Sequence, residues 1–147
     1  MKLHHIGYLV KNIEKSLPAF LSLGYNPVSL CTGEESCTAY VYDEVRQCNF
    51  CFLRRCDDAE RNTEQVYVEL IAPCSPSSPV WGLLSTYKNA PYHLCFESED
   101  LERDILSLRK SGWLVFQPAA AAPAINNRLV VFLVHRSAGI VELVSNG

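Results

Sequence analysis

The sequence has little that would direct it to a membrane, to nucleic acid or to a phosphate group. It holds no uninterrupted apolar run long enough to cross a bilayer, and its longest basic runs are dipeptides such as Arg54 and Arg55. No glycine-rich loop of the phosphate-binding kind is visible, and residues 1–5 are not followed by the apolar segment of a signal peptide. We therefore expect a cytoplasmic protein with neither nucleic acid nor a membrane as its partner.

The cysteines do not form a disulfide framework or a zinc motif. Their number is seven, which is odd, and nothing indicates secretion. Cys48 and Cys51 have C-x-x-C spacing, but they lie in the strand-like run CNFCFLRR, where residues three apart point to opposite faces. A zinc site would also need a second pair. Buried free thiols are the better interpretation.

What the sequence does contain is an ordinary globular composition. Of its 147 residues 48% are hydrophobic and 20% charged, with a net charge of −3. This length is enough for one compact domain with a substantial core, or for two small modules that share one.

The chain repeats one plan. The segments HHIGYLVKNIEKSLPAFLSLGY and YHLCFESEDLERDILSLRKSGW align without a gap when His5 is placed on His93, and Gly24 then falls on Gly112. Each segment has the pattern of a strand, a polar turn, a helix, a glycine stop and a further strand. Each half also ends in a similar run, VYVELIAP in the first and GIVELVSN in the second.

These patterns predict an α+β fold built from two βαβββ modules in one compact domain. Residues 1–73 form the first module and residues 92–147 the second. Residues 74–91, rich in proline and serine, form a linker with a short helix expected near residues 80–87.

Two histidines and two glutamates occupy equivalent places in the two modules. Glu69 and Glu142 interrupt apolar strand-like runs, where a buried carboxylate is costly unless it is paired or ligated. His5 and His93 open the two modules. A duplicated unit would bring the four together as a divalent-metal site with pseudo-twofold symmetry.

A simpler interpretation exists for each of these residues taken singly. A lone histidine on a strand is usually hydrogen-bonded or on the surface, and the glutamates would be ordinary if they lay on an exposed face. The correlated recurrence of the pair in both modules favours the metal site. His4 and His135 have no histidine as repeat partner, and we interpret them as structural or solvent-facing.

Several motifs resemble the vicinal oxygen chelate superfamily, also called the glyoxalase/bleomycin-resistance/dioxygenase fold. HHIGYLVKNIEKSLPAFLSLGY resembles its opening motif, and VELIAPCSPSSPV, YHLCFESEDLERDI and GIVELV are most similar to stretches of methylmalonyl-CoA epimerases and their glyoxalase-like relatives. The resemblance covers nearly the whole chain. It implies two βαβββ modules packed edge to edge, whose strands form a curled, half-open, eight-stranded mixed sheet.

The same resemblance implies that His5, Glu69, His93 and Glu142 are metal ligands. Such a mixed N/O site suits Co²⁺, Mn²⁺, Ni²⁺, Zn²⁺ or Fe²⁺. The ion would act as a Lewis acid that stabilises an enolate, and Glu142 is the candidate catalytic base. Epimerisation also needs an acid/base on the opposite face of the substrate. The strand expected to supply it, residues 47–55, carries no carboxylate.

Three functions follow, in order of preference. The first is a metal-dependent epimerase or isomerase, similar to methylmalonyl-CoA epimerase, that acts on an acyl thioester or related carbonyl compound. The second is a glyoxalase-type lyase or thiol transferase. The third is a metal-free, resistance-type protein that sequesters a ligand, although such a protein has no need of four ligands. In each case we expect a small-molecule partner and a homodimer, because open edge strands need cover.

Overall fold

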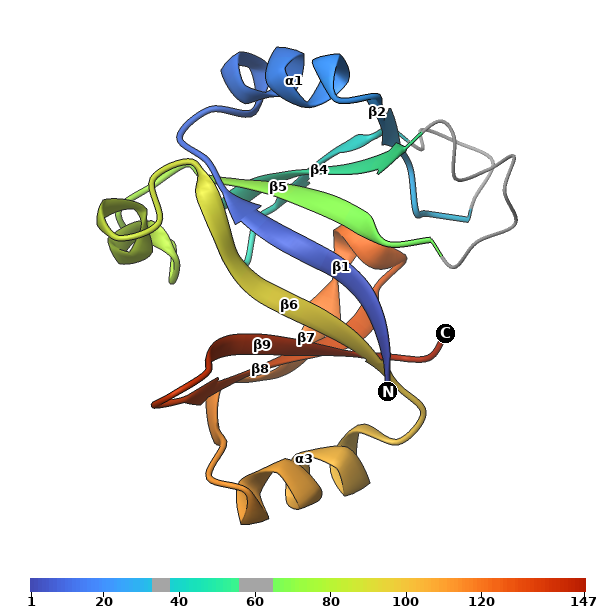
Figure 1. Ribbon diagram of the computed structural model, residues 1–147, viewed down its shortest axis with the longest axis vertical. Helices are drawn as coiled ribbons and strands as arrows, with labels where there is room; N and C mark the ends of the chain where they lie inside the picture. The colour runs from blue at the N-terminus through green and yellow to red at the C-terminus, as the bar shows by residue number, and fades with distance from the viewer. Residues whose placement is uncertain (33–37, 56–64) are drawn as a thin grey trace.

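The computed structural model describes residues 1–32, 38–55 and 65–147. In Figure 1 the two α-helices of the described residues lie at opposite ends, with strands between them, and β1 and β6 run side by side through the middle. The helices are α1 (Ile13–Ser22) and α3 (Leu101–Lys110), with short 3-10 helices η1 (Trp81–Ser85) and η2 (Pro123–Ile125). The strands are β1 (Lys2–Leu9), β2 (Tyr25–Val28), β3 (Tyr40–Asp43), β4 (Cys48–Arg55), β5 (Tyr67–Pro73), β6 (Ala90–Ser98), β7 (Leu114–Ala122), β8 (Arg128–His135) and β9 (Gly139–Ser145).

All described strands join one mixed sheet that does not close. Its order is β2-β4-β5-β1-β6-β9-β8-β7, and β3 also pairs with β4. The pairs β1–β5 and β6–β9 are parallel, and the other pairs are antiparallel. The expected α+β class and open mixed sheet are confirmed. The sheet has nine strands rather than eight, because β2 and β3 both pair with β4.

The two halves repeat the same strand register. In each half the first strand lies parallel to the last. The residue two positions after the histidine of the first strand pairs with the glutamate of the last strand. The partners are His5–Tyr67 and Gly7–Glu69 in the first half, and His93–Ile140 and Cys95–Glu142 in the second. The symmetry expected from the repeated sequence is therefore present in the backbone pairing.

Three hydrophobic clusters stabilise this arrangement. One packs α1 on the outer face of the first half, through Leu17 and Phe20. Another packs α3 on the outer face of the second half, through Leu101 and Ile105. The third contains residues of both halves, and it includes Cys48 on β4.

Both helices begin and end in the same way. The side chains of Asn12 and Asp100 accept hydrogen bonds from the backbone of the residue three positions later, which caps the first turn. Gly24 and Gly112 follow the two helices with φ of +85° and +91°, a conformation that glycine adopts without strain. The equivalent glycines thus stop equivalent helices.

The remaining features follow the sequence patterns. Cys48 belongs to the shared inner cluster and Cys51 to the cluster under α1, so the C-x-x-C residues lie on opposite faces. Both are free thiols. In the linker, η1 occupies part of the stretch expected to be helical. Among the described residues, no helix is both long and apolar enough to cross a membrane.

Candidate metal centre

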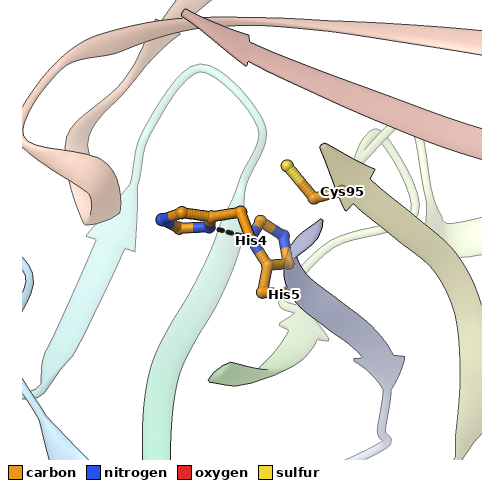
Figure 2. A group of neighbouring side chains, drawn as sticks. All are labelled: His4, His5 and Cys95. Carbon is orange, nitrogen blue, oxygen red and sulfur yellow. Dashed lines mark hydrogen bonds between the residues drawn. The ribbon is translucent and has the colours of Figure 1, made fainter. Parts of the chain in front are cut away.

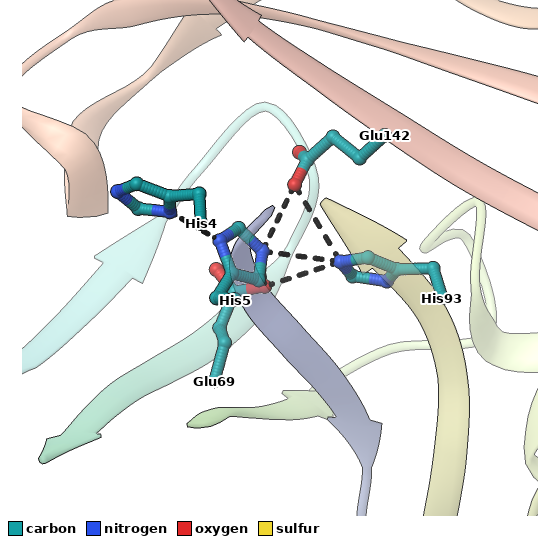
Figure 3. A network of polar contacts seen from close by, with 5 residues as sticks. All are labelled: His4, His5, Glu69, His93 and Glu142. Atoms are coloured by element: carbon teal, nitrogen blue, oxygen red, sulfur yellow. Dashed lines mark hydrogen bonds and ion pairs between the residues drawn. The ribbon is translucent and has the colours of Figure 1, made fainter. Parts of the chain in front are cut away.

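The four predicted ligands meet in the interior of the molecule. His5 Nε2 lies 3.2 Å from Glu69 Oε2, 3.0 Å from Glu142 Oε2 and 3.2 Å from His93 Nε2. His93 Nε2 lies 3.7 Å from Glu69 Oε2 and 3.5 Å from Glu142 Oε2. Figure 3 shows the side chains converging from separate strands, and none is more than 5% exposed. One atom from each residue thus lies within 4.8 Å of all the others.

The shared register explains this convergence. Side chains alternate between the two faces of a strand, and the four ligands point to the inner face of the curled sheet. Each glutamate lies opposite a phenylalanine of the neighbouring antiparallel strand, Phe52 in the first half and Phe132 in the second. These rings pack edge-on against His5 and His93, with both centroid distances at 5.2 Å.

Each ligand histidine is preceded by a buried residue that simple alternation would point outward. The β1–β6 pairing shifts register at two places, between Leu3 and His5 and between Gly7 and Tyr8. The shifts leave one extra residue in each strand, His4 in β1 and Tyr92 in β6. Such bulges re-aim side chains near functional sites.

His4 contacts the ligand histidine of its own strand. Its Nδ1 lies 2.7 Å from His5 Nδ1, a contact drawn in Figure 2. Burial and the neighbouring His5 and Arg128 lower the pKa of His4 to about 4, so His4 is neutral at physiological pH. When Nε2 of His5 serves as a ligand, Nδ1 of His5 carries the ring proton and donates a hydrogen bond to Nδ1 of His4. Such a hydrogen bond fixes the tautomer and orientation of a ligating imidazole.

His93 is held differently. A Cβ atom on Gly7 would overlap the imidazole of His93, so this ring lies directly against the glycine. The equivalent position in the second half is Cys95, which contacts His5 and is buried. His93 Nδ1 is buried and has no hydrogen-bond partner among the described residues.

The carboxylates and imidazoles polarise one another strongly. Burial alone would raise the pKa of Glu142, but His5 and His93 hold it well below its usual range. Burial alone would likewise lower the pKa of His5, but Cys95 and the two carboxylates outweigh that effect and raise it well above its usual value. Without an ion, the site therefore favours a protonated His5 beside ionised Glu142.

This donor set fits a divalent cation. Ligands about 2.1 Å from one ion are separated from their neighbours by about 3.0–3.4 Å, and the five contacts above span 3.0–3.7 Å. Glu142 Oε2 is buried and accepts no hydrogen bond from the described residues, although His5 Nε2 is 3.0 Å away. Two carboxylates buried together also need positive charge beside them, which a divalent ion supplies.

A cavity adjoins the two glutamates. The space that the centre of a water-sized sphere can occupy is about 30 Å³, and the space not filled by atoms is about 470 Å³ when the part open to solvent is included. Both halves contribute its walls, which are mostly apolar. Besides Glu69 and Glu142, the polar side chains that line it include Asp43, Arg46, Tyr92 and Gln117.

Asp43 is a further carboxylate of this cavity, and it is already paired. It is 2% exposed. Its Oδ1 accepts the backbone N–H of Arg46 at 2.9 Å, and its Oδ2 accepts the guanidinium Nη1 at 2.5 Å. The same nitrogen donates to the carbonyl oxygen of Ala121 at 2.8 Å, which links the β3–β4 turn to the end of β7.

Sequence reasoning selected the four residues that meet here, but it missed two of their neighbours. His4, which the sequence indicates as structural or solvent-facing, is not solvent-facing but buried against His5. For Tyr92 the sequence indicates only a place in a strand. Both precede a repeat-equivalent histidine, which was the available signal. The bulges that turn them inward were not predictable from alternation.

The comparisons with known proteins agree with this fold. A family model described as the glyoxalase/bleomycin resistance protein/dioxygenase superfamily matches residues 4–132. The chain belongs to this superfamily, whose members usually bind a divalent metal. No curated protein matches the chain in sequence.

Solved structures with the same fold include methylmalonyl-CoA epimerases. A hypothetical protein from Bacillus halodurans has a TM-score of 0.76 at 21% identity, over 99% of this chain and 94% of its own. The Streptomyces coelicolor methylmalonyl-CoA epimerase, in complex with 2-nitronate-propionyl-CoA, has a TM-score of 0.76 at 17% identity, over 100% and 98%. The Mycobacterium tuberculosis epimerase has a TM-score of 0.74 at 18% identity, over 99% and 88%. At these identities the likeness concerns the fold.

Proposed function

We propose that this protein is a divalent-metal-dependent epimerase or isomerase that acts on an acyl thioester or a related carbonyl compound through an enolate. The observation that carries the proposal is the set of four buried donor atoms within 4.8 Å, beside a cavity lined by Glu69 and Glu142. The epimerases among the structural neighbours support the substrate class.

His5, Glu69, His93 and Glu142 would hold the ion, which supplies a Lewis acid that stabilises negative charge on the substrate oxygens. Co²⁺, Mn²⁺, Ni²⁺, Zn²⁺ and Fe²⁺ all suit these nitrogen and oxygen ligands. The apolar walls of the cavity exclude water, which strengthens every electrostatic interaction with the substrate.

Glu142 is the proposed base for the proton on the carbon next to the carbonyl. Its carboxylate lines the cavity as well as belonging to the cluster of four donor residues. Glu142 would therefore take the proton from one face of the substrate. Return of the proton by Glu142 to the same carbon restores the original configuration, so inversion needs an acid on the opposite face. A positioned general base of this kind contributes about 10²–10⁴-fold to the rate.

Epimerisation requires a second acid/base, and Asp43 is the cavity carboxylate that remains. Arg46 donates to both of its oxygens, so neither oxygen of Asp43 is without a protein partner. That observation favours the second candidate function, a glyoxalase-type lyase or thiol transferase, for which one carboxylate that moves a proton on a single face is enough. The Asp43→Asn variant separates the two functions. If Asp43 is the second acid/base, the variant loses epimerisation while Glu142 still exchanges the proton at the substrate carbon. If Glu142 acts alone, the variant keeps the activity of the parent protein.

We also expect a homodimer. β7 forms one edge of the sheet, and Leu114 and Phe116 on this strand are 68% and 43% exposed. Apolar side chains along an open edge favour association with another chain.

The direct test of the proposed function is deuterium incorporation from D₂O into methylmalonyl-CoA, measured after loading the protein with each of the five metals. Metal-dependent exchange at the carbon next to the thioester, lost in Glu142→Gln, is the expected result. Stoichiometric ligand binding with neither bound metal nor exchange would instead favour a protein that sequesters its ligand.

A further inference from the structure

The hydroxyl of Tyr92 has no hydrogen-bond partner among the described residues, and the side chain lines the cavity. The residue is 7% exposed and lines the cavity that Glu69 and Glu142 also line. The hydroxyl is not among the fully buried polar atoms, so it is open to a ligand or water in the cavity. It is also the one hydroxyl among the side chains that line this cavity.

The backbone and the neighbouring rings fix where this hydroxyl lies. Tyr92 is the extra residue of the β6 bulge, which turns it to the same face as His93. Its ring packs edge-on against His93, with centroids 4.5 Å apart and planes at 89°, and it also contacts Tyr87 at 6.0 Å. The phenol is therefore held beside the metal centre by the same bulge that positions the ligand.

A purely structural role does not account for the oxygen. Phenylalanine would fill the same space, so packing alone does not require the hydroxyl. The other strong donor of the cavity, Arg46, already uses its Nη1 for Asp43 and Ala121. The presence of the Tyr92 hydroxyl is explained if a ligand bound in the cavity accepts a hydrogen bond from it.

We propose that Tyr92 is a catalytic residue whose hydroxyl donates a hydrogen bond to an oxygen of the carbonyl substrate. The inference rests on the proposed function and adds a requirement to its substrate class, namely an oxygen acceptor on the side of the reacting carbon that faces Tyr92. No bond forms or breaks at the phenol, and its proton stays on the tyrosine. The hydrogen bond strengthens as the acceptor gains negative charge during enolisation, so it stabilises the transition state more than the ground state.

The matched test is Tyr92→Phe, with Tyr8→Phe as control. Phenylalanine keeps the ring contacts with His93 and Tyr87 and removes only the oxygen. Tyr8 lies outside the cavity and packs against Phe20. Both variants should bind the same amount of metal as the parent protein and unfold at a similar temperature.

Two readouts decide the proposal. Removing one such donor lowers kcat by about 10²–10³, so Tyr92→Phe should slow deuterium exchange to this extent with a smaller change in KM. Calorimetric titration of the metal-loaded protein with acetylacetone, which binds as an enolate, should show at least tenfold weaker affinity in Tyr92→Phe and an unchanged affinity in Tyr8→Phe.

Parental kcat and acetylacetone affinity in a fully metal-loaded Tyr92→Phe would overturn the inference and leave the proposed function in place. Absence of metal and of exchange in the parent protein would overturn both. A lower melting temperature with unchanged kinetics would assign the hydroxyl a structural role only, which also contradicts the inference.

Discussion

The two halves of the molecule supply the same ligands but surround them differently. Each contributes a histidine and a glutamate in the same register, with a phenylalanine against the ring. In the first half the residue before the ligand is His4, which is hydrogen-bonded to His5. In the second half it is Tyr92, whose hydroxyl is left for the cavity. Duplication thus accounts for the symmetric set of four donor residues. In the proposed function, divergence at one bulged position separates a side that would support the metal from a side that would face the substrate.

The largest expected effect comes from breaking the shared ligand set. Glu142→Gln keeps the shape of the side chain but removes its charge and its ability to accept a proton. We expect loss of stoichiometric metal and a decrease in kcat of about 10²–10⁴ or more, because the variant loses a ligand and a general base together. Glu102→Gln, on the exposed surface of α3, is the control and should retain both. Normal exchange in Glu142→Gln would exclude this residue as the base.

Gly7→Ala tests the close approach between Gly7 of the first half and the His93 ring of the second half. The added methyl group would overlap the ring of His93, so the imidazole must leave its position. We expect loss of stoichiometric metal and a loss of stability of about 1–3 kcal/mol, typical of overpacking. The measurements are metal content and denaturant unfolding.

Gly82→Ala is the matched control, since a Cβ atom there meets nothing within 4 Å. Gly82→Ala should retain metal. A Gly7→Ala variant that also retained a full complement of metal would show that His93 need not lie where the structure has it.

His4→Phe sharpens the comparison between the halves. It removes the nitrogen that contacts His5 and keeps a ring against Phe52 and Tyr67. Loss of such an outer partner typically lowers metal affinity by about 10–100-fold, measured by competition with a chelator. Tyr92→Phe, at the equivalent position, should leave metal affinity unchanged. Equal effects of the two variants would contradict the division of roles.

The pH dependence of metal affinity is the smallest of these expected effects, measured per pH unit. His5 must lose a proton to bind an ion, and its pKa in the ion-free protein is raised well above its usual value. Affinity should therefore increase with pH by about tenfold per unit while the pH is below that pKa, and then level off above it. Calorimetry in buffers of different ionisation enthalpy measures the released proton. Affinity that falls as pH rises through neutrality would have the wrong sign.

The sequence predicted the features that depend on repetition and alternation. Equivalent glycines indicated the ends of the two helices, and carboxylates in apolar strands indicated residues that meet inside. Tertiary pairing decided the rest. β2 and β3 share one edge of β4, which no local pattern indicates.

Single-residue bulges were equally invisible. Alternation predicts that a residue beside an inward-facing histidine points outward, and a register shift at His4 and at Tyr92 reverses this. The ion pair between Asp43 and Arg46 across the β3–β4 turn was likewise not predicted. An acidic and a basic residue three positions apart are common on protein surfaces, and their spacing does not show that they line a cavity.

The central claim is that both halves hold one ion between them. Native mass spectrometry of protein loaded with Co²⁺ or Zn²⁺, run beside His5→Ala and His93→Ala, tests it most directly. We expect one ion per chain in the parent protein and loss of stoichiometric metal when the histidine of either half is removed. A parent protein without stoichiometric metal, or variants that keep the ion with only one half intact, would contradict it.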